Sequence, residues 1–166
     1  IFRYIFFYLY KYSNPKGSLI VNIYDYKLQI PLQYDGIGKA LFIFKCRELD
    51  HKWIIDKELS PGNVVLDLGA NIGYYAVMEA KKIGNQGKIY AIEPDPRNIE
   101  FLKKNISLNN IENIFEFEQG AISNKAEKAE FILSSKTNLS SFENNKNLKN
   151  SEIIKVQTYD LGEYLK

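Results

Sequence analysis

The stretch VVLDLGANIGYYAV, residues 64–77, constrains the fold of this chain more than any other. It begins as a short run of β-branched and apolar residues, which is typical of a buried parallel strand. Two glycines follow, Gly69 and Gly73, and apolar residues then recur at helical spacing as Ile72, Ala76, Ala80 and Ile83. The stretch therefore predicts a central strand that enters a helix through a tight turn, with Asp67 where the strand ends.

Strands and helices continue to alternate after this stretch. KIYAIE, residues 88–93, predicts a second strand, and Asp95-Pro96 predicts the start of a second helix. In NIFEFEQG, residues 113–120, apolar and acidic side chains alternate, which predicts a third strand at a sheet edge. Residues 130–133 and 153–158 are expected to pair in antiparallel fashion around a polar loop. Such alternation indicates βαβ units and an α/β fold with a mostly parallel sheet.

The first sixty residues predict a cap before a partial core over residues 61–166. Residues 19–23 and 27–32 read as a hairpin, and a third apolar run at 40–44 follows a turn signal at Asp35-Gly36. In ELDHKWIIDKELSPG, residues 48–62, apolar side chains recur at near-helical spacing and stop at Pro61-Gly62. The cap is thus expected to hold a helix, short strands and another helix.

The N-terminal run IFRYIFFYLYKY is apolar on nearly every helical face. It is shorter than the ~20 residues that a membrane-spanning helix needs. We interpret it as a helix that covers the core. The alternatives are an interfacial anchor in which Arg3 and Lys11 extend toward water, and the end of a truncated membrane helix.

Composition bounds the partners and the redox chemistry. The 166 residues carry 22 Lys and Arg against 20 Asp and Glu, a formal charge of +2. Nucleic-acid binders usually need an excess of positive charge, so this balance predicts that nucleic acid is not a partner. The only cysteine, Cys46, excludes an internal disulfide and a cysteine metal cluster and fits a cytoplasmic protein. We expect structural roles for Cys46 and for the only histidine, His51, and no metal site.

The acidic residue Asp67 indicates which ligand the glycine turn receives. A dinucleotide site needs the spacing G-x-G-x-x-G, whereas this turn reads GANIG, with no third glycine. A carboxylate beside a pyrophosphate would also be repelled. S-adenosylmethionine instead presents an ammonium and a sulfonium group. Asp67 therefore favours S-adenosylmethionine as the cofactor.

A second acid defines the direction of the ligand. Glu93 lies 26 residues after Asp67, at the end of the next strand, where a carboxylate can accept both hydroxyls of a ribose. The adenine is then expected near the end of the third strand, at Gln119, Gly120 and Ala121. Each element also has a structural interpretation, since tight turns need glycine, Glu93 could cap the helix that follows, and Tyr74 and Tyr75 could be ordinary packing.

Taken together, these segments resemble the FkbM family of S-adenosylmethionine-dependent methyltransferases. The resemblance rests on VVLDLGANIGYYAV, IYAIEPDPRN, RELDHKWIIDKELSPG and VQTYDLGEYL. It implies a Rossmann-like class I methyltransferase fold, a three-layer sandwich, and methyl transfer to a hydroxyl of a sugar or another small or lipid-linked metabolite. It places Asp67, Gly69, Asn71 and Gly73 around the methionyl part, Glu93 at the ribose, Ala121 near the adenine, and Glu48 where it closes over the cofactor.

The family continues into a fourth strand beyond Lys166, so the C-terminal half of the fold is expected to be missing. The free edge of the 64–68 strand should then be unpaired, and no catalytic base can be assigned. A small-molecule or glycan acceptor is the expected partner. Two other functions stay open: a non-catalytic module that binds nucleosides, and an NAD-dependent oxidoreductase.

Overall fold

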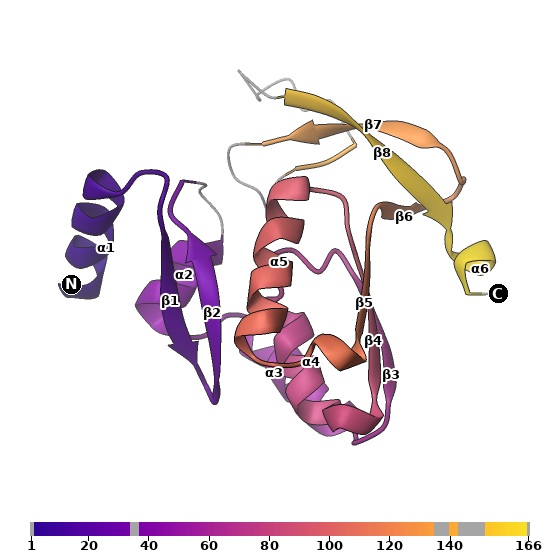
Figure 1. The fold of residues 1–166 in the computed structure, drawn as a ribbon, viewed down its shortest axis with the longest axis horizontal. Helices are drawn as coiled ribbons and strands as arrows, with labels where there is room; N and C mark the ends of the chain where they lie inside the picture. Colours follow the sequence, from indigo (N-terminus) through magenta and orange to yellow (C-terminus); the bar gives the residue numbers. More distant parts are fainter. Residues whose placement is uncertain (1, 34–36, 135–139, 143–151, 166) are drawn as a thin grey trace.

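A parallel three-stranded sheet forms the centre of the computed structural model, which describes residues 2–33, 37–134, 140–142 and 152–165. The strand order is β3 (Val64–Leu68), β4 (Lys88–Glu93) and β5 (Phe115–Gln119). Helices α4 (Tyr74–Ile83) and α5 (Pro96–Leu108) pack on one face of this sheet (Figure 1). The predicted Rossmann-like fold with parallel strands is thereby confirmed.

Local signals set the ends of both helices. Gly73, with φ 89°, precedes α4, and Gly84, with φ 65°, ends it. At the start of α5, Asp95 Oδ1 accepts a hydrogen bond from the backbone N–H of Arg97 at 2.9 Å, and Pro96 occupies the first helical position. The small side chains of Ala76 and Ala80 are buried and let α4 lie close to the sheet. These predicted features are confirmed.

Strand β3 is an edge strand and not the central strand that its apolar composition suggests. It pairs with β4 alone among the described strands, with Asp67 opposite Ala91. Val64 and Leu68 are consequently 69% and 47% exposed. The prediction of an unpaired edge is confirmed for the described residues, and β5 lies at the opposite edge as predicted.

The N-terminal part packs on the outer side of α5. Strands β1 (Ser18–Ile23) and β2 (Tyr26–Pro31) form the predicted antiparallel hairpin, whereas the third apolar run is helical and belongs to α2 (Ile37–Phe44). Helix α3 (Leu49–Glu58) leads into β3. One continuous apolar cluster runs from the hairpin to the sheet, so the two predicted units share a core. The division at residue 60 stays a prediction.

A buried asparagine joins the hairpin to the core. Asn105 of α5 accepts from the backbone N–H of Gln29 at 2.6 Å, and its Nδ2 donates to the carbonyl oxygens of Gln29 and Ile72 at 3.1 and 2.7 Å. These bonds satisfy backbone groups of β2 and of the glycine turn with a single side chain. The hairpin is therefore placed by the same helix that supports the turn.

The C-terminal strands form a separate small sheet. Its order is β6 (Ala121–Ser123), β8 (Glu152–Asp160) and β7 (Lys128–Leu133), and β7 and β8 are antiparallel as predicted. Short 3-10 helices at Gly84–Gln86 and Glu112–Ile114 precede β4 and β5. Helix α6 (Leu161–Tyr164) follows β8, and its Tyr164 helps to line a pocket against the second face of the central sheet.

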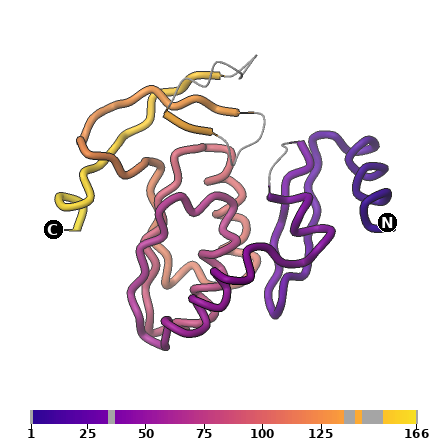
Figure 2. Tube along the Cα trace, turned by 180° about the vertical axis from the view of Figure 1, so that it is seen from behind, coloured from indigo at the N-terminus to yellow at the C-terminus, as the bar shows by residue number. Residues whose placement is uncertain are grey.

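Helix α1 (Phe2–Ser13) lies at the opposite end of the molecule from α6 (Figures 1 and 2). It packs on α2, where the ring centroids of Phe7 and Phe42 are 5.5 Å apart, and Phe7 is its one buried residue. Of the segment that we interpret as a cover for the core, Phe7 is therefore the one side chain that is buried. Among the described residues, no helix has the length and apolar character needed to cross a bilayer. The predicted turn at Asp35-Gly36 and most of the polar loop between β7 and β8 lie outside the described residues.

Candidate cofactor-binding site

The carboxyl ends of β3 and β4 bring the two predicted acids to one edge of the sheet. Asp67 is the fourth residue of β3, and Glu93 is the last residue of β4. The turn between β3 and α4 folds over this edge, because the N–H groups of Gly69 and Ala70 donate to the carbonyl oxygen of Ile92 at 2.8 and 3.2 Å. Ligands of open α/β sheets bind at such an edge.

Glu93 is 4% exposed and holds the turn in place. Its Oε2 accepts from the backbone N–H of Asn71 at 2.8 Å, while Oε1 accepts from the backbone N–H of Asp95 at 2.9 Å and from Asn98 Nδ2 at 3.0 Å. A carboxylate has about four acceptor positions. Protein groups fill three of them, and one position on Oε2 is left for a ribose hydroxyl. The ribose contacts expected from sequence stay a prediction.

Asp67 is half-buried, and its carboxylate lacks a full set of partners. Its Oδ2 has no hydrogen-bond partner among the described residues. Burial, and secondarily the charge of Glu93, raises the pKa of Asp67 to about 6. An unpaired carboxylate in such surroundings costs free energy in the folded protein. A positively charged ligand group would supply the missing partner.

Glu79 is a third acid at this site that sequence reasoning missed. It lies on α4, its Oε2 is also buried without a partner among the described residues, and burial followed by the charge of Asp67 raises its pKa to about 8. The available signal was its place in a helix whose neighbouring residues Met78 and Ala80 are both buried, although Glu79 itself is half-buried. A pKa of about 8 keeps Glu79 mostly protonated at pH 7. Asp67 and Glu93, which lie at the ends of their strands at this edge, are therefore the acids that favour a cationic ligand over a phosphate.

The three glycines of the predicted site have different roles. A Cβ on Gly69, which has φ 84°, would meet no atom within 4 Å, so the backbone faces open space at this position. A Cβ on Gly73 would lie 2.8 Å from Leu102 Cδ1, and one on Gly120 would lie 2.6 Å from Tyr159 Cε2. Gly69 therefore suits close approach of a ligand, whereas Gly73 and Gly120 are required by packing.

Asn71 and Ala121 frame the two ends of the edge. Asn71 has φ 53°, and its Oδ1 accepts from the backbone N–H of Ile72 at 2.9 Å, which supports the turn. The N–H of Gly120 donates to the carbonyl oxygen of Glu93 at 3.2 Å, so the start of β6 at Ala121 is tied to the end of β4. The expected order of ligand contacts along the edge stays a prediction.

Glu48 belongs to a polar cluster at the start of α4. Tyr75 donates its hydroxyl hydrogen to Glu48 Oε2, and Arg47 Nε donates to Oε1 at 2.8 Å. These hydrogen bonds, that of Tyr75 foremost, lower the pKa of Glu48. The hydroxyl of Tyr74 bonds to both the N–H and the carbonyl of Arg47 at 3.0 Å. The cluster fastens the segment before α3 to α4, and closure of Glu48 over a cofactor stays a prediction.

The fold and this edge define a class of protein, the Rossmann-like class I methyltransferases. A solved structure of P. horikoshii TYW2 in complex with MeSAdo superposes with a TM-score of 0.50 at 19% identity, over 70% of this chain and 47% of that one. The profile of the TRM5/TYW2 methyltransferase domain matches residues 37–142. The chain therefore belongs to the TRM5/TYW2 methyltransferase family. Membership of a methyltransferase family agrees with the predicted enzyme class and with the predicted cofactor, S-adenosylmethionine.

Two curated relatives are RNA methyltransferases by name. Ribosomal RNA large subunit methyltransferase E of Bdellovibrio bacteriovorus is 33% identical over 81 residues, 46% of this chain and 40% of that protein. The tRNA (guanine(37)-N(1))-methyltransferase Trm5b of Methanocaldococcus jannaschii is 43% identical over 58 residues, 35% of this chain and 16% of that protein. The chain thus spans less than half the length of these relatives.

Two predictions are corrected by these findings. The resemblance to the FkbM family is wrong, because the matching family is TRM5/TYW2. The motifs on which the FkbM resemblance rested belong to the cofactor edge, and this edge differs little between methyltransferases with different acceptors. The prediction that nucleic acid is not a partner is contradicted by the RNA methyltransferases among the relatives, and the family match does not support a sugar or small-metabolite acceptor. Net charge was a poor guide, because an average over the chain does not report local surfaces.

Proposed function

We propose that this chain binds S-adenosylmethionine at the carboxyl edge of β3 and β4 and takes part in methylation of an RNA. The observation that carries the proposal is the buried Oδ2 of Asp67, which lacks a partner among the described residues, beside the open space at Gly69. A cationic cofactor would supply a partner for this carboxylate and occupy the open space beside Gly69. Family membership and the names of the two relatives support the RNA acceptor.

The residues of the edge divide the work of binding. Asp67 faces the cationic amino-acid end of the cofactor, and Gly69 lets the backbone approach it. Glu93 contributes its remaining acceptor position on Oε2 to one ribose hydroxyl, while its other bonds keep the turn in shape. S-adenosylmethionine supplies a methyl group activated by the sulfonium. The protein's contribution is to hold donor and acceptor in line, so that transfer becomes effectively unimolecular.

Calorimetric titration of the chain tests the cofactor. S-adenosylmethionine is expected to bind more tightly than 5′-methylthioadenosine, because the second compound lacks the amino-acid end and its ammonium charge. NAD is the control, and tighter binding of NAD than of S-adenosylmethionine would contradict the proposal.

Transfer of a radiolabelled methyl group tests the acceptor. The full-length protein that contains this chain is incubated with labelled S-adenosylmethionine and either transfer RNA, ribosomal RNA or a mixture of mono- and oligosaccharides. Label is expected in RNA alone. Label in the saccharides and none in either RNA would overturn the RNA part of the proposal while leaving cofactor binding intact.

A further inference from the structure

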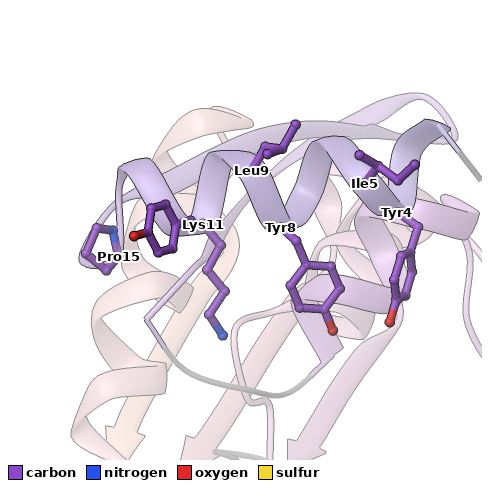
Figure 3. Close-up of a pocket in the computed structure, with 7 residues that line it drawn as sticks. Tyr4, Ile5, Tyr8, Leu9, Lys11 and Pro15 are labelled. Carbon is purple, nitrogen blue, oxygen red and sulfur yellow. The ribbon is translucent and has the colours of Figure 1, made fainter.

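The outer face of α1 is an apolar surface that methyl transfer does not use. Of the helix residues, seven are exposed and apolar or aromatic: Phe2, Tyr4, Ile5, Phe6, Tyr8, Leu9 and Tyr12. Figure 3 shows Tyr4, Tyr8 and Lys11 projecting on one side of the helix and Ile5 and Leu9 on another, along a shallow pocket. Large exposed apolar patches mark sites of interaction.

Positive charge surrounds this face. Residues 1–24 include Arg3, Lys11 and Lys16 but no Asp or Glu, and the first acidic residue of the chain is Asp25. Lys39 of α2 lies with its Nζ 5.6 Å from the ring centroids of both Tyr4 and Tyr8. Residues 1–46 hold six Lys and Arg and two Asp and Glu, although the whole chain has a net charge of only +2. Four of these cations, Arg3, Lys11, Lys16 and Lys39, lie on α1, just after it or against its rings.

We propose that α1 docks this face on a lipid bilayer with anionic headgroups. Phe, Tyr, Ile and Leu side chains would enter the boundary between headgroups and acyl chains, while the surrounding cations contact the headgroups. A helix of 12 residues is about 18 Å long, too short to cross a hydrocarbon core of about 30 Å, so it lies along the surface.

The chemistry of the face favours lipid over other occupants. A nucleic-acid strand would use the aromatic rings and the cations but would leave Ile5 and Leu9 in water. A second copy docked through the same face would bring two sets of like charges together. Because α1 and the C-terminal strands lie at opposite ends of the molecule, docking leaves the central sheet away from the bilayer (Figures 1 and 2).

Vesicle flotation tests the proposal. The chain is mixed with vesicles of phosphatidylcholine alone or with one quarter phosphatidylglycerol. Binding is expected to the anionic vesicles, weaker binding to the neutral ones, and a decrease with added salt. The double variant Ile5→Asn/Leu9→Asn should lower the partition coefficient at least about tenfold, since burial of one aliphatic side chain is worth about that factor.

Two further variants keep the test specific. Ile153→Asn, on β8, changes a side chain that is 57% exposed, close to the 51% of Ile5, and should bind vesicles as the unmodified chain does. Lys11→Gln/Lys16→Gln should reduce binding to anionic vesicles and leave binding to neutral ones unchanged. Equal circular dichroism melting curves confirm that each variant folds.

Other results would overturn the proposal. One is vesicle binding that is unaffected by the Ile5→Asn/Leu9→Asn variant. Another is an absence of vesicle binding together with binding of single-stranded RNA that this variant removes, which would assign the face to nucleic acid. A third is self-association, measured by analytical ultracentrifugation, that the same variant abolishes when no vesicle binding is seen.

Discussion

Replacing Asp67 by Asn should stabilise the protein without ligand and weaken its binding of cofactor. In the folded state, burial and the neighbouring charge of Glu93 raise the pKa of Asp67 to about 6, from 3.8 for an exposed side chain. Each pKa unit corresponds to about 1.4 kcal/mol. Above pH 6 the carboxylate therefore destabilises the fold by at most about 3 kcal/mol, and Asn removes this cost.

The sign of the pH dependence follows from proton uptake. Because the pKa of Asp67 is higher in the folded state, the folded protein binds more protons than the unfolded chain between about pH 4 and pH 6. The contribution of Asp67 to stability therefore falls as the pH rises through this window. The difference between the Asn variant and the original chain should be largest above pH 6 and vanish near pH 4.

Urea denaturation followed by circular dichroism measures this difference at pH 7.5 and pH 4. Asp50→Asn, which removes the same charge from an exposed position on α3, is the control and should change the free energy of unfolding little at either pH. In calorimetry, Asp67→Asn should weaken S-adenosylmethionine binding by about 1.5 to 3 kcal/mol, the range for a hydrogen bond to a charged group. Unchanged stability at pH 7.5 together with unchanged affinity would refute the reasoning.

Three further changes test the support of the site. Glu93→Gln places an NH2 group against backbone donors and should lower the free energy of unfolding by about 1 to 3 kcal/mol; an unchanged urea midpoint would show that its bonds do not hold the turn. Gly73→Ala should lower the free energy of unfolding more than Gly69→Ala, because only a Cβ at Gly73 would meet Leu102. Gly69→Ala should instead cause the larger loss of cofactor affinity. The reverse order in denaturation and calorimetry would contradict the assigned roles. Tyr74→Phe loses both bonds to the backbone of Arg47 and should speed hydrogen exchange at the amide of Arg47, with Tyr90→Phe on β4 as the control that leaves it unchanged.

Sequence alone was enough for features that depend on neighbouring residues. The strand, glycine turn and helix around Asp67, the N-cap at Asp95 and the antiparallel pairing of β7 with β8 were all predicted correctly. Each follows from hydrophobic period, capping oxygens or positive φ, which are local properties of the chain. The cofactor class followed for the same reason, since Asp67 and the glycines lie within one short segment.

The acceptor class and the family could not be predicted from local features of the sequence. The quoted motifs describe the cofactor edge, and the acceptor is chosen by surfaces that no short pattern in this chain describes. The helical state of the run at residues 40–44 was also missed, because a short apolar run has no period that separates strand from helix.

By itself, the sequence determined the alternation of strands and helices from residue 64 to residue 119, the parallel sheet and the two acids at the strand ends. Only the tertiary structure decided that Glu79 joins Asp67, that three protein donors already occupy Glu93, and that α1 presents its apolar face to solvent. The physical reason is that burial and hydrogen-bond saturation depend on contacts between distant segments. A residue's type sets which bonds it can form, and the packing of other segments around it sets how many remain for a ligand.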